Sequence, residues 1–161
     1  MRVLVDSSTI IALARIGGLE LLKSTFGKVY VTKSIEREIL NPGHPDTAVI
    51  EKALGDWIVT VTVKGNEARY RKLGLGSGEA SLFLTGKEDV LVVDELNARK
   101  LAESEGRAFT GLLGLILAAV EERILDRERA LSMVDRLSDS SFRMSAQLYR
   151  EMVRRIAEIG K

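Results

Sequence analysis

The stretch Asp89-Val-Leu-Val-Val-Asp94 places a run of aliphatic residues directly before an aspartate. The stretch Val3-Leu-Val-Asp6 repeats this design near the start of the chain. Each run has the length and the β-branched composition of a buried strand, and each is followed by a segment of helical character. The two stretches therefore predict strands of a mainly parallel sheet whose carboxyl ends both carry an aspartate.

Further short apolar runs alternate with helical stretches along the rest of the chain, which is typical of an α/β domain. Strands are predicted at residues 2–5, 28–31, 57–63, 89–93 and 108–109. Helices are predicted at residues 7–16, 19–25, 33–40, 46–54, 79–85, 95–105, 112–122, 127–137 and 145–159, with residues 64–78 largely loop. No linker or repeat interrupts this order, so one domain is expected.

The composition narrows the class of protein. A chain of 161 residues with 45% hydrophobic and 29% charged residues suits one soluble globular domain. The absence of cysteine excludes disulfides, Cys-ligated zinc and a thiol nucleophile. No apolar run approaches the roughly 18 residues of a membrane span, so we expect a cytoplasmic protein with no membrane contact. The net charge of +1 means that any nucleic acid would bind through a local patch.

The two strand-end aspartates have two possible roles, ligand binding and helix capping. In an open parallel sheet, ligands bind beyond the carboxyl ends of the strands, at the switch in strand order. If the two strands are neighbours, Asp6 and Asp94 face each other there, and their repulsion is relieved by protonation or by a cation. A hard divalent cation suits such oxygen ligands. An aspartate between a strand and a helix is also a common helix N-cap, and the two roles are compatible.

Taken alone, the aspartate pair also fits two kinds of phosphoryl-transfer protein. A receiver domain would carry adjacent acids before the first helix and a separate phosphorylated aspartate. A haloacid-dehalogenase-like phosphatase would carry a second aspartate at position 8, where this chain has Ser8. Both alternatives are therefore disfavoured.

Two further acids stand at notable positions. Glu38 lies in the helical stretch SIEREIL (residues 34–40), beside the apolar face marked by Ile35 and Ile39. Glu79 follows the glycine-rich residues 74–78 and heads an apolar helix. Glu38 could equally be a solvated helix residue, and Glu79 a first-turn acid favoured by the helix dipole.

With these acids in order, the chain resembles the PIN-domain family, and within it the branch of VapC-like toxins. The resemblance implies a three-layer α/β/α fold with a mainly parallel five-stranded sheet, formed by a single domain over residues 1–161. It implies a Mg²⁺- or Mn²⁺-dependent endoribonuclease that is the toxin of a toxin–antitoxin pair. The alternative is a PIN-like module that binds RNA or protein with little or no nuclease activity. The resemblance rests on residues 3–22, 31–40, 74–84, 90–106 and 110–125.

The resemblance also implies roles for individual residues. It assigns catalysis and metal binding to four acids, Asp6, Glu38, Glu79 and Asp94. Many relatives have aspartate at the third of these sites, so the longer arm of Glu79 is a departure. Supporting roles near the metal or the phosphate fall to Ser8, Arg99 and Thr110. The implied partners are RNA, an antitoxin protein and, because the family commonly forms homodimers, a second copy of the chain.

The basic stretch KGNEARYRK (residues 64–72) leads into the helix of Glu79. Arg69, Arg71 and Lys72 are predicted to follow a phosphate backbone while Tyr70 stacks a base, although a solvated loop is the alternative. The C-terminal helix carries Arg150, Arg154 and Arg155 opposite an apolar face, and is predicted to pack on the domain or on a partner.

Two other features of the sequence concern a possible interface and the single histidine. Residues 112–120 are apolar on most faces, which indicates either core or a subunit interface. His44, the only histidine, stands in a proline-containing loop and is predicted to be a surface residue and not a ligand.

Overall fold

The computed structural model describes residues 1–43 and 46–160, so His44 lies outside the described residues. The strands are β1 (Val3–Val5), β2 (Val29–Thr32), β3 (Ile58–Val61), β4 (Val90–Val92) and β5 (Phe109–Thr110). The helices in the described part of the chain are α1 (Ser7–Arg15), α2 (Glu20–Phe26), α3 (Lys33–Ile39), α4 (Thr47–Ala53), α5 (Ala68–Arg71), α6 (Ser77–Leu82), α7 (Leu96–Ser104), α8 (Leu112–Glu121), α9 (Arg127–Ser138) and α10 (Ala146–Glu158).

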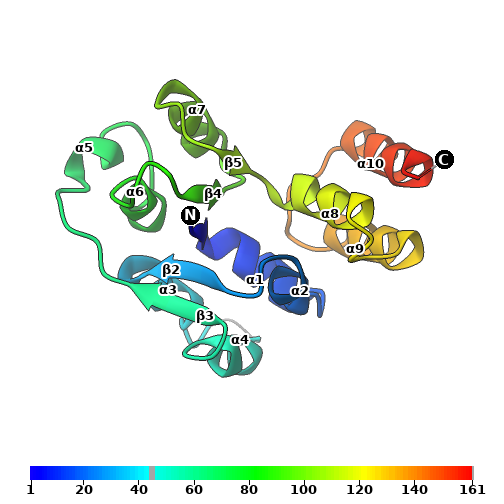
Figure 1. Ribbon diagram of the computed structural model, residues 1–161, viewed down its shortest axis with the longest axis horizontal. Helices are drawn as coiled ribbons and strands as arrows, with labels where there is room; N and C mark the ends of the chain where they lie inside the picture. Colours follow the sequence, from blue (N-terminus) through cyan, green and yellow to red (C-terminus); the bar gives the residue numbers. More distant parts are fainter. Residues whose placement is uncertain (44–45, 161) are drawn as a thin grey trace.

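The five strands form one parallel sheet in the order β3-β2-β1-β4-β5, flanked by helices as a three-layer α/β/α fold (Figure 1). The chain builds the sheet outward from β1 to β3 and then returns to place β4 on the other side of β1. The switch in strand order therefore falls between β1 and β4, where Val5 pairs with Val92. This confirms the predicted fold class, and it meets the condition under which Asp6 and Asp94 face each other, because the two aspartate-bearing strands are neighbours.

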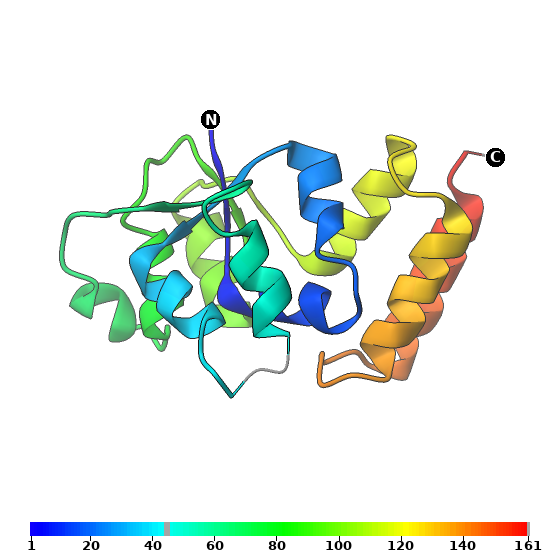
Figure 2. The same cartoon turned by 90° about the horizontal axis from the view of Figure 1, so that it is seen from below.

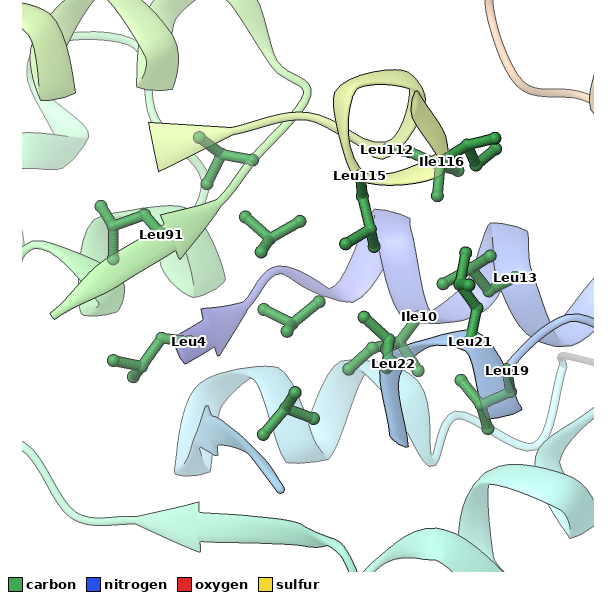
Figure 3. Close-up of a cluster of buried hydrophobic side chains, with 14 of the residues drawn as sticks. Leu4, Ile10, Leu13, Leu19, Leu21, Leu22, Leu91, Leu112, Leu115 and Ile116 are labelled. Carbon is green, nitrogen blue, oxygen red and sulfur yellow. The ribbon is translucent and has the colours of Figure 1, made fainter. Parts of the chain in front are cut away.

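The hydrophobic core lies around these two central strands. Leu4 of β1 and Leu91 of β4 are completely buried, as their β-branched and aliphatic surroundings predicted. Leu112 and Leu115 of α8 reach the same cluster from the other side, together with Ile10 of α1 (Figure 3). Six of the ten residues of α8 are buried within the chain itself. Residues 112–120 therefore contribute mainly to the core, while Leu113 is partly exposed and Gly114 and Ala118 are exposed.

The segment predicted to be loop contains a short helix, α5. Tyr70 on that helix is buried, and its ring lies 5.5 Å from the ring of Phe83, centroid to centroid. This tertiary contact orders a polar, glycine-rich stretch in which local propensity alone indicates loop. The next helix, α6, begins at Ser77, two residues before the predicted start, and Glu79 is therefore its third residue.

The last three helices gather at one end of the molecule (Figure 1). Helices α9 and α10 form an antiparallel pair, here named the C-terminal hairpin, which packs on α8 (Figure 2). Asp126 caps α9 by accepting the Arg129 N–H, and Ser145 caps α10 by accepting the Leu148 N–H. Within residues 1–43 and 46–160, no helix has the length and apolarity that crossing a membrane requires.

Candidate metal centre and its cavity

Asp6 stands at the carboxyl end of β1 and is 3% exposed. Its backbone N–H donates to the carbonyl of Val92, which holds it against β4. The side chain caps α1, because Oδ1 accepts the Ser7 N–H at 2.8 Å. Burial, together with the nearby charges of Glu79 and Glu38, raises the pKa of Asp6 to about 7. The helix-cap interpretation is therefore correct. The charged form of the carboxyl group is nevertheless disfavoured by burial and by the two neighbouring acids.

Glu38 reaches this carboxyl group from α3. Its Oε2 accepts a 2.5 Å hydrogen bond from the hydroxyl of Ser7, which directs the carboxylate toward the end of β1. The approach is possible because residue 78 is glycine. A Cβ at Gly78 would lie 2.4 Å from Oε1 of Glu38. The solvated-helix interpretation of Glu38 is thus incomplete, since its head group is held at the strand end.

Glu79 uses its two carboxylate oxygens differently. Oε1 accepts the N–H of Gly76 at 3.2 Å and so caps the first turn of α6. Oε2 is buried without a hydrogen-bond partner. Burial raises the pKa of Glu79, and the charges of Glu95 and Glu38 act in the same direction against the Gly76 hydrogen bond. A buried oxygen without a partner is costly, and a water molecule or a cation bound to it would remove this cost.

Asp94 follows β4 and is half-buried. Its Oδ2 accepts from the hydroxyl of Thr9 at 2.9 Å, and its Oδ1 accepts the N–H of Leu112 at 2.9 Å. A Cβ at residue 111 would lie 2.7 Å from Oδ1, so Gly111 admits the carboxylate to the start of α8. Asp94 therefore ties α1 to α8 and does not cap the helix that follows it.

The structure brings Asp6, Glu38 and Glu79 together as a mutually interacting set, with Asp94 beside them on the same cavity. Among the described residues, none of these four carboxylates forms an ion pair with a lysine or arginine. Nor do three Asp, Glu or His side chains of this part of the chain form a preassembled metal cage. The donor set is nevertheless one that a hard cation prefers, and the unpartnered Glu79 oxygen and the pKa of Asp6 indicate unbalanced negative charge. These residues fit a divalent ion held by few carboxylates and several waters.

The acids open into a cavity of about 860 Å³, the size of a ligand-binding site. Acids line the end at the sheet, while arginines and an aromatic residue line the end at the C-terminal hairpin. Arg69, Arg71 and Lys72 do not line it. Arg69 instead stacks on Tyr70 and lies 3.9 Å from Glu105, so this basic stretch is separate from the cavity.

A comparison with known families decides the class of the chain: the family model of the PIN domain matches residues 2–158. The chain belongs to the PIN-domain family. Comparisons with curated proteins and with solved structures gave no significant match. The family match confirms the predicted membership, and it removes the receiver-domain and phosphatase alternatives. PIN domains are generally nucleases that use divalent metal ions, which supports a nuclease-type or RNA-related module. The toxin branch stays a prediction.

In this PIN domain the three supporting residues all line the cavity. Ser8 donates a long, 3.4 Å hydrogen bond to Oδ2 of Asp6. The guanidinium of Arg99 lies over the ring of Phe109 at 5.5 Å and forms no ion pair with a described acid. Thr110 donates to the carbonyl of Gly111 at 3.3 Å. The guanidinium of Arg99 is thus available to bind an anion in the cavity.

Sequence reasoning missed the residues that position the acids in this PIN domain. Ser7 holds Glu38, Thr9 holds Asp94, and Gly78 and Gly111 make room for the same two carboxylates. The run Ser7-Ser8-Thr9 is a visible signal, but by sequence alone it indicates only the start of the helix predicted at residues 7–16. Which hydroxyl serves which acid depends on the packing of α1 against α3 and β4.

Proposed function

We propose that this PIN domain is a Mg²⁺- or Mn²⁺-dependent endoribonuclease that hydrolyses phosphodiester bonds of RNA. The observation that carries the proposal is the unpartnered buried oxygen of Glu79 beside Asp6 and Glu38, at the switch point of the sheet. Cleavage of a phosphodiester needs concentrated positive charge near the reacting phosphate. The carboxylates would provide that charge indirectly, by binding a divalent cation.

Asp6, Glu38 and Glu79 are the residues that would hold the cation, with Asp94 bound directly or through water. A divalent ion bound there would supply positive charge at the phosphodiester and would lower the pKa of a water molecule. Ser7 and Thr9 keep Glu38 and Asp94 in place, so that little reorganisation is needed when substrate arrives. Arg99, whose guanidinium is free of acids, would contact a phosphate oxygen.

The test is cleavage of a mixed single-stranded RNA pool with Mg²⁺, with Mn²⁺ and with a chelator. We expect cleavage by the unaltered protein with either metal, and a loss of at least 100-fold in Asp6→Asn and in Asp94→Asn. Asp56→Asn is the matched control, because Asp56 is exposed and lies outside the cavity. Equal cleavage by Asp6→Asn and the unaltered protein would identify a contaminating nuclease and overturn the proposal.

One observation favours the alternative, a module that binds RNA or protein without efficient cleavage. Both oxygens of Asp94 already accept hydrogen bonds from the chain, so this acid has less capacity to bind a metal directly. If the alternative holds, the protein binds RNA but the pool stays intact with Mg²⁺ and Mn²⁺ alike.

We further propose that the chain is the toxin of a toxin–antitoxin pair. The toxin role predicts that expression of the chain arrests growth and that an antitoxin protein, encoded nearby, relieves the arrest. We also expect a cytoplasmic homodimer. Light scattering of the purified protein tests the dimer, and growth with and without the neighbouring gene tests the toxin role.

A further inference from the structure

The cavity extends well beyond the four acids. One wall is the surface of α1, and the opposite wall is α8, where Leu113 and Leu117 line it. The far end is closed by the C-terminal hairpin, through the loop of residues 140–143 and through Met152 and Arg155 of α10. With a helical rise of 1.5 Å per residue, Arg15 at the end of α1 lies about 13 Å along the helix from Asp6. A group bound at this far end is therefore a neighbouring part of the substrate and not the reacting phosphate itself.

Positive charge collects at this far end. Arg15 of α1, Arg143 of the loop and Arg155 of α10 all line the cavity there, and all three are exposed. In the described part of the chain, the guanidinium groups of Arg143 and Arg155 form no hydrogen bond and no ion pair, although the Arg155 carbonyl accepts the N–H of Ile159 within α10. Arg15 donates to the hydroxyl of Ser141 at 2.6 Å and so fixes the loop to α1. Two guanidinium groups are thus free to bind an anion. Their position suits the phosphate backbone of a nucleic acid whose other end reaches the four acids.

An aromatic ring accompanies these arginines. Phe142 lines the cavity and is only partly buried, with one part of its side chain against the core. Its backbone is held, because its N–H donates to Oγ of Ser140 at 3.1 Å and that hydroxyl donates to the carbonyl of Leu137 at 2.7 Å. A fixed, accessible aromatic ring beside free arginines is the arrangement on which unpaired bases stack.

We propose that the C-terminal hairpin is the nucleotide-binding half of the site and selects single-stranded nucleic acid. In this proposal, which rests on the proposed function, a base adjoining the reacting phosphate stacks on Phe142 while Arg143 and Arg155 bind neighbouring phosphates. A duplex is excluded because its bases are enclosed in the stack and reach a side chain only after they are flipped out. The substrate-binding surface is then the hairpin and not the stretch from Arg69 to Lys72.

The test is equilibrium binding of fluorescein-labelled single-stranded RNA, single-stranded DNA and duplex RNA, measured by anisotropy with a chelator present and at several salt concentrations. The variants are Phe142→Ala, Arg143→Ala and Arg155→Ala. Arg150→Ala is the matched control, because Arg150 lies exposed on α10 but outside the cavity. Thermal unfolding of each variant verifies that it is folded.

We expect single strands to bind more tightly than the duplex. Phe142→Ala weakens single-strand binding about 10-fold with an unchanged salt dependence. Each arginine variant lowers the slope of log affinity against log salt by about 1. A preference for RNA or for DNA, in either direction, supports the proposal. Unchanged single-strand binding in all three folded variants would overturn it and assign the hairpin to a protein partner. Because binding is read without metal, a protein that binds but does not cut refutes only the proposed catalysis.

Discussion

The hydroxyl of Ser7 donates a 2.5 Å hydrogen bond to Oε2 of Glu38 and joins the first turn of α1 to α3. Ser7 also gives its N–H to Asp6, so one residue orients two of the candidate metal ligands. In metal sites, such supporting hydrogen bonds commonly contribute 10- to 100-fold to metal affinity or activity.

Ser7→Ala should therefore weaken Mn²⁺ binding and RNA cleavage about 10-fold, because the Glu38 carboxylate loses its donor. The backbone N–H to Asp6 is retained, so the fold should persist. The measurements are an Mn²⁺ titration and the cleavage rate at saturating metal. Ser132→Ala, an exposed position on α9, is the control. Unchanged Mn²⁺ affinity in Ser7→Ala would mean that Ser7 serves packing alone.

Gly78→Ala should impair the site while leaving the fold intact. The added Cβ would lie 2.4 Å from Oε1 of Glu38, so the carboxylate must move away. Helix propensity acts in the opposite direction and favours alanine by about 1 kcal/mol. We expect a loss of cleavage of about 10-fold or more, with a melting temperature that is unchanged or raised.

A matched glycine separates this effect from the general effect of a methyl group. A Cβ at Gly86 would lie 2.6 Å from Oε1 of Glu88, an exposed side chain away from the cavity. Gly86→Ala should therefore keep full cleavage. Equal rates in both glycine variants would contradict the role assigned to Gly78.

Asp6→Asn should stabilise the metal-free protein, although it removes the central ligand. The side chain is 3% exposed and faces the charges of Glu79 and Glu38, so its negative charge is unfavourable without a cation. The asparagine Oδ1 can still accept the Ser7 N–H and cap α1. We expect a gain of about 1–3 kcal/mol in the free energy of unfolding in the presence of a chelator. Urea unfolding at pH 8 measures it, and a loss of stability would show that the carboxylate is structurally required.

The pH dependence of stability should reflect Asp89, which lies outside the site. Burial by itself would raise the pKa of Asp89, but two hydrogen bonds and the charge of Arg2 lower it below its usual value. A folded-state pKa below the unfolded one adds stability above about pH 4, and this stability is lost as the pH falls through the folded value. Asp89→Asn should therefore lower the free energy of unfolding by about 1–3 kcal/mol at pH 7, a modest loss because Arg2 is partly exposed and solvent screens the pair. The loss should be smaller at acidic pH, where Asp89 itself becomes protonated.

The control for Asp89 is an exposed ion pair. Arg154 and Glu158 lie 3.0 Å apart on α10, and both side chains are 60% exposed. Glu158→Gln should change the free energy of unfolding by less than about 0.5 kcal/mol. Both variants are measured by urea unfolding from pH 3 to pH 7. Comparable losses in the free energy of unfolding for Asp89→Asn and Glu158→Gln would show that burial does not make the Asp89 pair the more stabilising one.

The sequence predicted those parts of the fold that depend on local pattern. The apolar runs before Asp6 and Asp94 identified β1 and β4 as parallel strands, whereas their pairing as neighbours is known only from the structure. Helix α5 could not be predicted in this way, because Tyr70 is ordered by a contact with Phe83, distant in the chain.

In the candidate site, too, some residues follow from local sequence pattern and others only from tertiary packing. The four acids could be proposed from strand ends and from resemblance, whereas the partners of those acids depend on how α1 packs. The role of Thr9 toward Asp94 spans 85 residues of sequence and has no local signal. Arg143 and Arg155 were not predicted either, since they join the cavity only because the C-terminal hairpin packs on α8 beside α1.

The central claim is that the acids hold a divalent cation, and thermal unfolding with increasing Mn²⁺ tests it most directly. A ligand that binds only the folded state stabilises it by about 2.7 kcal/mol at a concentration 100 times Kd. The account predicts that Mn²⁺ raises the melting temperature of the unaltered protein by several degrees, in proportion to the logarithm of its concentration, and leaves Asp6→Asn unchanged. An equal rise in both proteins, or no rise in either, would contradict the metal centre built on Asp6, Glu38 and Glu79.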